Sequence, residues 1–466
     1  MKKSCVLSIL LLLFTSEAFT QRFLTLDDCR NLAIENNKNL KIATQEEKAA
    51  YYQKKEAFTK YFPELSFSGT YLRNEKNLNL LSSSAIPTQI TLPDLTGIGI
   101  PFPGATIPIG DEYRKKIKDA GEIDIKNVWV AGFSLVQPVF MGGKIIAYND
   151  IQKYAEELAK SKKDTKLTDV IVETDNAYWQ IVSLSNKERL AESYVELLRK
   201  MESDIIAMEE EGLATKADRL SVSVKLNEAE MTLTKAENGL SLAKMYLSQI
   251  CGLDISDQIT LQDEQIKTLN VVEETIPVSD VNEAIANRDE IKSLQLATKI
   301  YKKQETISRS EFMPQVAFTA SYLWTNPSSF DGFETKFGGM WNLGVAVKVP
   351  LNIFSSAAKL NTAKANSRIA QYQLDDAKEK IELQVNQSTY KLNEANKKLK
   401  MSTRNMEKAD ENLRYANTGF EEGVIPASDA LSAHTAWMSA HSEFIDAQID
   451  VKLCKLYLDQ AMGRVF

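Results

Sequence analysis

Two aspartates occupy the same place in two similar stretches of the chain. Asp218 ends the stretch EEGLATKAD and Asp429 ends EEGVIPASD, and each follows a glycine by six residues. Gly212 and Gly423 follow long periodic segments, and glycine is the residue that most readily takes the positive φ at the end of a helix. A carboxylate in the first turn of the next helix accepts hydrogen bonds from free backbone N–H groups. The spacing therefore predicts two tight reversals between helices, with an aspartate near the start of each returning helix.

The other reactive side chains form no catalytic or metal-binding motif. His434 and His441 are seven residues apart on one helical face with no thiol beside them, so we expect ordinary packing rather than a metal site. Beyond the first 20 residues the cysteines are Cys29, Cys251 and Cys454, an odd and scattered set that we interpret as buried or half-buried thiols without a disulfide framework. The sequence has no G-x-S-x-G motif, no phosphate-binding loop and no carboxylate pair of evident purpose. We therefore expect that the protein is not an enzyme and that it binds neither a metal ion nor a cofactor.

The helices that would hold the two reversals are unusually long. Between Leu360 and Phe420, positions near a 3.5-residue period are apolar or small, and no proline interrupts the pattern. A helix of that length would extend over roughly 90 Å, whereas an average helix has about 11 to 12 residues. The stretch from about Gly143 to Glu211 has a similar period. Such sustained periods are typical of coiled-coil packing, so each helix needs partners of similar length.

The first 20 residues have the composition of a secretory signal peptide. Lys2 and Lys3 precede an apolar run from Val6 to Phe14, and small and polar residues lead to an expected cleavage site near Thr20–Gln21. The run is too short for a transmembrane helix, and no later stretch has 18 consecutive apolar residues. A formal net charge of -7 and the lack of a basic patch argue against a nucleic-acid partner.

Four short stretches alternate between apolar and polar residues and are expected as strands at about 64–73, 128–137, 315–325 and 340–349. Each has the length of a tilted strand in a membrane barrel, with aromatic residues near its ends as in the girdles at a membrane surface. A small soluble sheet with one covered face would show the same alternation. The aromatic residues that we assign to a membrane girdle are Phe67, Tyr71, Trp129, Phe133, Phe318, Tyr322, Trp324 and Trp341.

The chain contains one structural plan twice. AIENNKNLK at 33–41 aligns with AIANRDEIK at 284–292 at an offset of 251, the returning strands align at 212, and the two reversals align at 211. Each copy has the order helix, strand, strand, long helix, tight turn, helix. The expected parts are a signal peptide (1–20), a first repeat (21–252) with its long helix at about 143–211, a linker (253–280) and a second repeat (281–466) with its long helix at about 355–422.

Four strands are too few to close a membrane barrel. Open strand edges in lipid would leave backbone groups without partners at several kcal/mol each, and single-chain barrels begin at eight strands. If the strands lie in a membrane, at least two copies of the chain must complete one barrel. The first repeat also carries 39 extra residues between its strands (251 minus 212), within 74–126, and we expect them to form a long external loop whose deletion (78–115) leaves assembly intact.

The signal peptide, the doubled plan, the opening TLDDCRNLAIENNKNLKIA and the paired turns resemble the TolC family of outer-membrane efflux channels over essentially the whole mature chain. The resemblance implies a mainly α protein with a small membrane β-barrel part. It implies a homotrimer that forms a 12-stranded β-barrel in the outer-membrane lipid of a Gram-negative bacterium and a long coiled-coil α-barrel in the periplasm.

The implied function is passive conduction of small molecules, such as drugs and toxic compounds, to the exterior. The implied partners are a periplasmic adaptor (membrane fusion) protein and an inner-membrane efflux pump of the RND or ABC type. A duct for a type I protein or peptide secretion system is the alternative. An exported coiled-coil structural or binding protein is a remote alternative, because it would explain the long helices but neither the strands nor the repeat.

The resemblance also suggests roles for the turn residues. In the family, an acidic residue at the position of Asp429 helps to form a negative ring at the closed entrance, so Asp429 is the main pore candidate and Asp218 the second. Capping of the returning helices is the alternative for both. The tip on which the adaptor's helical hairpins would dock comprises Gly212, Leu213, Ala214, Gly423, Val424 and Ile425.

The chain departs from the family pattern at three entrance positions. Phe420 and Ile425 stand where the family has the Tyr and the Arg of its closed-state lock, and Ser432 replaces a second acidic ring. We expect apolar packing of Phe420 and Ile425 to hold the entrance shut, with a weaker acidic ring. A place for both residues in the buried seam between helices is the alternative.

Overall fold

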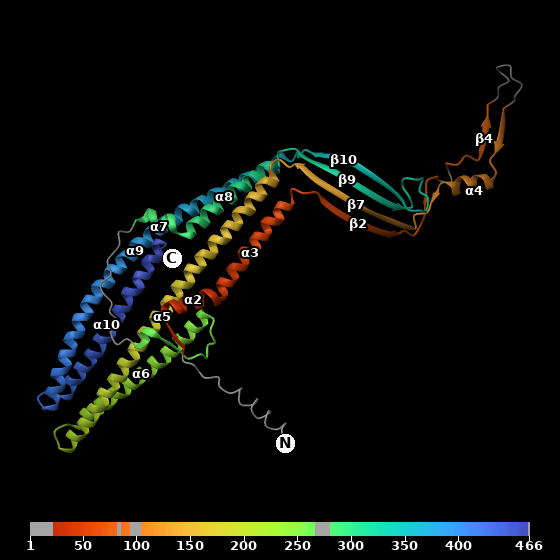
Figure 1. Cartoon of the computed structure of the whole chain (residues 1–466). Coiled ribbons are helices and arrows are strands. Elements are labelled where there is room, and N and C mark those ends of the chain that lie inside the picture. The colour runs from red at the N-terminus through yellow and green to blue at the C-terminus, as the bar shows by residue number, and fades with distance from the viewer. Residues whose placement is uncertain (1–21, 82–84, 94–103, 266–279, 465–466) are drawn as a thin grey trace, which may run out of the picture. The chain divides into compact units, whose positions relative to one another are not determined.

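The structure is a computed structural model that describes residues 22–81, 85–93, 104–265 and 280–464 (Figure 1). The expected signal peptide, 1–20, lies outside the described residues. The chain divides into two compact units, which we name the helical unit and the sheet unit. The helical unit takes its described residues from Met1–Tyr52, Lys153–Tyr301 and Asn366–Phe466, and the sheet unit comprises those of Gln53–Gln152 and Lys302–Ala365.

The helical unit contains two copies of one arrangement, each built around a long helix and a shorter helix that returns beside it (Figure 1). The first copy comprises α2 (Leu26–Asn36), α3 (Lys38–Thr59), α5 (Lys144–Glu210) and α6 (Lys216–Cys251). The second copy comprises α7 (Val281–Asn287), α8 (Asp289–Ser310), α9 (Ile353–Glu421) and α10 (Ala427–Met462). The long helices α5 and α9 have 67 and 69 residues and extend beyond the helical unit into the sheet unit. Within the described ranges, no helix is both long enough and apolar enough to cross a lipid bilayer.

The 3.5-residue pattern of α9 marks the side of the helix that is buried. The opposite side exposes large residues such as Tyr372 and Tyr390. From Leu374 onward, the seam residues of α9 share buried clusters with residues of α10, so the sequence pattern and the packing agree. The buried apolar residues of this seam on α9 are Ala363, Ala370, Leu374, Ile381, Val385, Leu392, Ala395, Leu399, Leu413, Ala416 and Phe420.

The internal repeat is visible in matching contacts. Ala33 of α2 and Ala284 of α7 are both fully buried at equivalent positions. Gly252 and Gly463 end α6 and α10 with φ of 68° and 67°. A Cβ atom added at Gly252 would lie 2.5 Å from the Cβ of Asn36, the last residue of α2. In each copy, a helix ends so close to a preceding helix that only glycine fits.

The expected linker, 253–280, contains regular structure that the sequence did not indicate. Strand β8 (Ile259–Leu261) pairs in parallel with β1 (Arg22–Leu24), and a short 3₁₀ helix, η2 (Gln262–Gln265), follows it. Ile259 and Leu261 are buried in the core of the first copy. Three residues are too few to produce a readable alternation, which is why this pairing was missed. Residues 266–279 lie outside the described residues.

The sheet unit holds an antiparallel four-stranded sheet in the order β10-β9-β7-β2. Its strands are β2 (Glu64–Arg73), β7 (Asn127–Phe140), β9 (Gln315–Asn326) and β10 (Gly338–Lys348), which lie where strands were expected. Strands β2 and β10 form the two edges of this sheet.

The register places all eight predicted girdle residues on one face of the sheet. Phe67 pairs with Phe133, Phe133 with Tyr322, and Tyr322 with Trp341, so these four form a row across all four strands. Directly paired residues share a face, as do residues two apart on a strand, so the other four lie on the same face. They are Tyr71, Trp129, Phe318 and Trp324. The opposite face is mixed: it carries small polar residues, which include Ser66, Ser68, Thr70, Ser134, Ser321 and Asn342, and also the apolar residues Leu72, Val128, Val130, Leu323 and Met340.

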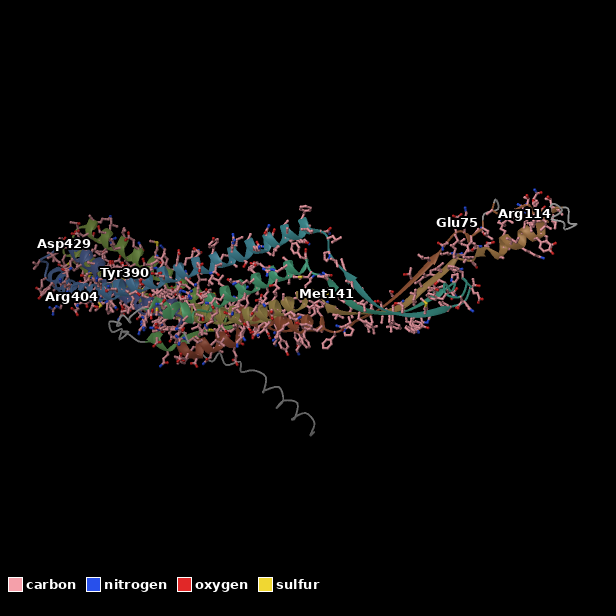
Figure 2. All side chains as sticks on the ribbon, turned by 90° about the horizontal axis from the view of Figure 1, so that it is seen from above. Glu75, Arg114, Met141, Tyr390, Arg404 and Asp429 are labelled. Atoms are coloured by element: carbon pink, nitrogen blue, oxygen red, sulfur yellow. The ribbon has the colours of Figure 1, made fainter. Side chains whose placement is uncertain are left out.

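The extra residues of the first repeat are folded rather than irregular. Strand β3 (Leu78–Asn79) pairs with β6 (Glu122–Ile123), β4 (Gln89–Leu92) pairs with β5 (Ala105–Pro108), and α4 spans Asp111–Ala120. Figure 2 labels Glu75 and Arg114 in this extension. Residues 82–84 and 94–103 of the expected loop lie outside the described residues. The β3–β6 ladder therefore forms the base of the extension.

Candidate functional site at the two helical turns

The first turn joins α5 to α6 through a Schellman motif. The N–H of Leu213 donates to the carbonyl of Met208 at 2.7 Å, and the N–H of Gly212 donates to the carbonyl of Glu209 at 3.0 Å. Gly212 has a φ of 76°, a left-handed conformation that glycine adopts without strain. These bonds satisfy carbonyls that the end of α5 would otherwise leave free.

The second turn, between α9 and α10, repeats this geometry. The N–H of Val424 donates to the carbonyl of Gly419 at 2.7 Å, and the N–H of Gly423 donates to the carbonyl of Phe420 at 3.0 Å. Gly423 has a φ of 70°. The two turns lie at the same end of the helical unit (Figure 1), and we call them together the tip turns.

The tip turns expose apolar side chains. Leu213 is 79% exposed and Val424 is 77% exposed, and a Cβ atom added at Gly212 or Gly423 would meet nothing within 4 Å. Ile425, in contrast, is half-buried against the cluster beneath the turns, as is Ala214. Each turn thus has one half-buried residue, Ala214 or Ile425, and one exposed apolar residue, Leu213 or Val424. Exposed apolar side chains of this kind suit contact with another protein.

Asp218 takes the capping role. Its carboxylate accepts hydrogen bonds from the N–H of Thr215 at 3.0 Å and from the Thr215 hydroxyl at 2.6 Å, and the N–H of Asp218 donates to Thr215 Oγ1 at 3.2 Å. This reciprocal pattern is a capping box at the start of α6. The hydrogen bonds from the Thr215 side chain and backbone lower the pKa of Asp218 below its usual value. Within a single chain, Asp218 therefore caps α6, which is the alternative to a role in the pore.

Asp429 has no such role, although it lies at the equivalent position. The cap position of α10 is Pro426, which makes no side-chain cap hydrogen bond. Among the described residues, the only hydrogen bond to the Asp429 carboxylate is a long one, 3.4 Å, from Ser428 Oγ. Figure 2 labels Asp429 at the end of the helical unit, where its side chain is exposed. Proline in place of Thr215 removes the capping hydroxyl and leaves the carboxylate of Asp429 free for other contacts.

Phe420 lies in the seam rather than on the open surface of its turn. It is 7% exposed and belongs to an apolar cluster, the hairpin cluster, that joins the α5–α6 hairpin to the α9–α10 hairpin. Ile425 packs partly buried against this cluster. Ser432 is exposed, and its hydroxyl donates to the carbonyl of Ser428 at 2.9 Å. The buried residues of the hairpin cluster are Tyr194, Val195, Leu198, Met201, Ile205, Val222, Leu226, Ala229, Phe420, Ala427, Ala430 and Leu431.

Ion pairs support the same contact between hairpins. Lys200 of α5 pairs with Glu421 of α9 at 3.0 Å, and Lys187 of α5 pairs with Asp446 of α10 at 2.6 Å. All four side chains are partly exposed, so each pair contributes little by itself. The apolar hairpin cluster therefore contributes most of the stabilisation of the contact between the two hairpins.

The two histidines both pack in α10, and neither belongs to a metal cluster in the described part of the chain. His434 is 3% exposed, and its Nε2 lies 2.8 Å from Asn417 Oδ1. His441 Nε2 lies 2.7 Å from Asp410 Oδ1, and its ring packs against Trp437. Burial lowers the pKa of His434 below its usual value.

Acidification from pH 7 to pH 5 is expected to loosen the α9–α10 hairpin near His434. The pKa of the folded state lies below the unfolded value of about 6.5, so the opened state binds the proton more readily and stability falls as the pH drops below that value. Hydrogen exchange of residues 427–440, corrected for intrinsic rates, measures the effect. The pH dependence should persist in His441→Gln and flatten in His434→Gln. An equal pH dependence in His434→Gln would contradict the assignment.

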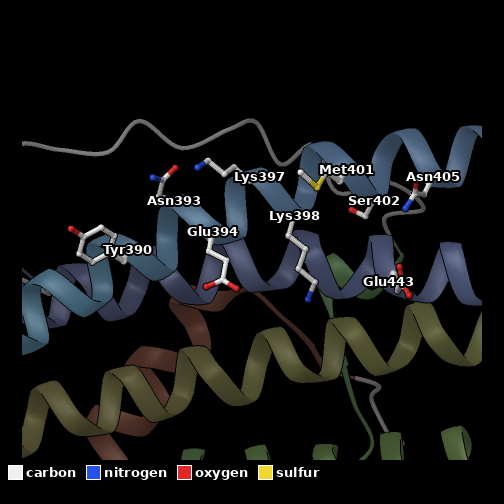
Figure 3. Close-up of a pocket in the computed structure, with 9 residues that line it drawn as sticks. All are labelled: Tyr390, Asn393, Glu394, Lys397, Lys398, Met401, Ser402, Asn405 and Glu443. Atoms are coloured by element: carbon white, nitrogen blue, oxygen red, sulfur yellow. The ribbon is translucent and has the colours of Figure 1, made fainter.

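Figure 3 shows an open groove along α9, with a volume of about 540 Å³. Glu443 of α10 lies at one side of it, and Lys398 extends toward α10 to pair with Asp450 at 2.7 Å. Its charges are mixed, and its lining residues come mostly from one helix. The α9 residues that line it are Tyr390, Asn393, Glu394, Lys397, Lys398, Met401, Ser402 and Asn405.

The sequence matches the family model described as outer membrane efflux protein over residues 29–253 and 281–464. No curated protein matches the chain in sequence. Solved structures are similar in fold at low identity. The CmeC outer membrane channel of Campylobacter jejuni is 15% identical with a TM-score of 0.74, covering 95% of this chain and 86% of its own. The MtrE outer membrane channel of Neisseria gonorrhoeae, solved in its open state, is 16% identical with a TM-score of 0.71, covering 94% of this chain and 88% of its own.

Proposed function

The chain belongs to the outer membrane efflux protein family, and from that premise we propose that it is the outer-membrane exit duct of a tripartite efflux system. Three copies would form one channel in a Gram-negative bacterium. The duct would receive small molecules from a periplasmic adaptor and an inner-membrane pump of the RND or ABC type and conduct them passively to the exterior. The observation that carries this proposal is the two-faced, open-edged sheet of β2, β7, β9 and β10.

The four-stranded sheet would supply one third of a twelve-stranded membrane barrel. Its aromatic face stays exposed in the single chain, with Trp341 at 68%, and suits contact with lipid. Its opposite face carries serine, threonine and asparagine, which suit a water-filled interior. The edges β2 and β10 run in opposite directions, because each strand in the order is antiparallel to the next. The β2 strand of a second copy would therefore extend the sheet beside β10 in the same antiparallel pattern, and three copies give twelve strands.

The tip turns would form the periplasmic entrance in the trimer. Copies of Asp429 would converge on the channel axis, where their negative charges would attract cations. Leu213 and Val424 supply exposed apolar contacts for an adaptor. The hairpin cluster around Phe420 would hold the hairpins together and so keep the entrance narrow.

Conductance in planar bilayers tests this proposal. The wild-type channel should prefer cations, and Asp429→Asn should lower the cation-to-anion permeability ratio severalfold because the converging carboxylates are neutralised. Asp218→Asn is the matched control, because its carboxylate serves the capping box at the equivalent position and the amide oxygen of asparagine can still accept from the N–H of Thr215. Equal effects of both substitutions, or none from Asp429→Asn, would refute the entrance ring. Failure of the protein to form any channel would refute the proposed function.

Removing the extension is expected to leave trimer assembly intact. The deletion expected from the sequence, 78–115, would break the β3–β6 ladder, so a better deletion replaces 82–119 with Asn-Gly and keeps that ladder as a hairpin. All four strands of the main sheet and both of its edges remain. The molecular mass of the protein in detergent should correspond to three chains before and after the deletion. Loss of the trimer would show that the extension takes part in assembly.

A further inference from the structure

Two cysteines that are far apart in the sequence meet in the core of the first copy. Cys29 of α2 and Cys251 at the end of α6 are 222 positions apart, and the Cys251 Sγ lies 3.6 Å from the Cys29 backbone oxygen. Both cysteines belong to the same buried apolar cluster. Both residues are fully buried, and both are free thiols in the structure. The structure agrees with the interpretation of buried or half-buried thiols, and it adds that these two lie next to each other.

The backbone around the pair is held by other contacts. Next to Cys29, the guanidinium of Arg30 donates from Nε to Asp175 of α5 at 2.7 Å, and Asp175 is almost fully buried. On the other side, Gly252 ends α6 against Asn36 of α2. The ends of α2 and α6 are thus held against each other, with both cysteines between them in the core.

The second copy does not use this pair. At the offsets of the repeat, Cys29 corresponds to Asp280 and Cys251 corresponds to Met462. Asp280 caps α7 by accepting from the N–H of Asn282 at 2.9 Å, and Met462 is buried in the core. The repeated plan therefore does not require cysteine at either position, and the pair is a feature of the first copy.

We propose that Cys29 and Cys251 are joined by a disulfide in the exported protein. The compartment follows from the proposed function, since the periplasm is oxidising whereas the cytosol keeps thiols reduced. The oxidant is a thiol–disulfide oxidoreductase in its disulfide form. The two cysteines lose two protons and two electrons to form the S–S bond, and the disulfide of the oxidant is reduced to two thiols.

Burial sets the order of events. A mixed disulfide with an oxidoreductase requires an accessible sulfur, so oxidation takes place before α2 packs against α6. In the folded protein the bond is shielded from reductants by the core around it. The bond closes a loop that includes β2, β7, α5 and α6 and ties the N-terminal helix to the end of the first copy. Cys454 is half-buried elsewhere in the second copy and stays a thiol, which makes it an internal control.

Peptide mapping tests the bond directly. Cells that export the full chain are quenched in acid and denatured in N-ethylmaleimide, and the purified protein is digested with trypsin without reductant. We expect the peptide of residues 23–30 linked to that of residues 245–267, with Cys454 carrying the maleimide. Recovery of Cys29 and Cys251 each with a maleimide, or a link from either one to Cys454, would overturn the proposal.

Resistance to reductant provides a second readout that needs no variant. Dithiothreitol should leave the bond intact in the folded protein and cleave it once guanidinium is added.

The double variant Cys29→Ala, Cys251→Ala should unfold several degrees lower than the wild type, whereas Cys454→Ser should match the wild type. Equal unfolding temperatures in all three proteins would count against a bond. A conducting channel with two alkylated cysteines refutes the disulfide alone, and a linked pair in a protein that forms no channel refutes only the proposed function.

Discussion

Phe420→Ala is expected to increase the open fraction of the channel in planar bilayers by about a hundredfold. Phe420 is 7% exposed in the hairpin cluster, whose members come from both hairpins. Truncating a buried phenylalanine costs about 3 kcal/mol or more. If the closed entrance depends on this contact and the open one does not, that cost shifts the equilibrium by about two powers of ten. Ile425→Ala should act in the same direction with a smaller effect, because Ile425 is only partly buried.

Tyr415→Ala is the matched control for this experiment. Tyr415 is an aromatic residue on the same helix, α9, but its side chain is 63% exposed. Removal of this side chain should leave the open fraction of the channel unchanged. If Phe420→Ala and Ile425→Ala both conduct like the wild type, the hairpin cluster stabilises the fold without closing the entrance.

Gly252→Ala is expected to destabilise the protein far more than Gly212→Ala. Both glycines have positive φ, 68° and 76°, so both substitutions carry the cost of a left-handed alanine, about 1 to 2 kcal/mol. At Gly212 the added methyl group meets nothing within 4 Å. At Gly252 it would lie 2.5 Å from the Cβ of Asn36, so α2 would have to move, at a further ~1–3 kcal/mol.

Thermal unfolding in detergent distinguishes the two substitutions. Gly212→Ala should lower the midpoint slightly, whereas Gly252→Ala should lower it severalfold more or prevent recovery of folded protein. Gly463→Ala offers an independent check, because the added atom would lie 2.9 Å from the Cβ of Asn287 in the second copy. Equal midpoints for Gly212→Ala and Gly252→Ala would mean that the helix end at Asn36 is more adaptable than its contacts indicate.

Much of the fold was readable from the sequence because its signals are long or repeated. The seam of α9 extends over dozens of residues, and the strands β2 and β7 alternate over enough positions to assign their faces. The offset between the copies then fixed the order of the elements. Short or non-local features gave no such signal: the pairing of β1 with β8 involves three residues, and nothing in the spacing of Cys29 and Cys251 shows that they touch.

The two tip turns show how far sequence alone could assign a site. The repeat predicted equivalent positions for Asp218 and Asp429, and the turns do share one geometry. The different use of the two carboxylates depends on the cap position, Thr215 in one turn and Pro426 in the other. The aligned stretches contain that difference, because Thr215 and Pro426 occupy the same position in them. For Phe420, the sequence could not separate a gate from a seam, because an apolar residue at this period fits both.

The central claim is that the sheet of β2, β7, β9 and β10 lies in lipid and is completed by other copies of the same chain. Light scattering of the purified protein, corrected for bound detergent, tests this most directly. We predict a particle of three chains that precipitates or aggregates when the detergent is removed. A single chain that stays dispersed in aqueous buffer without detergent would contradict it, because neither the aromatic face nor the edges β2 and β10 would then need lipid or a neighbouring copy.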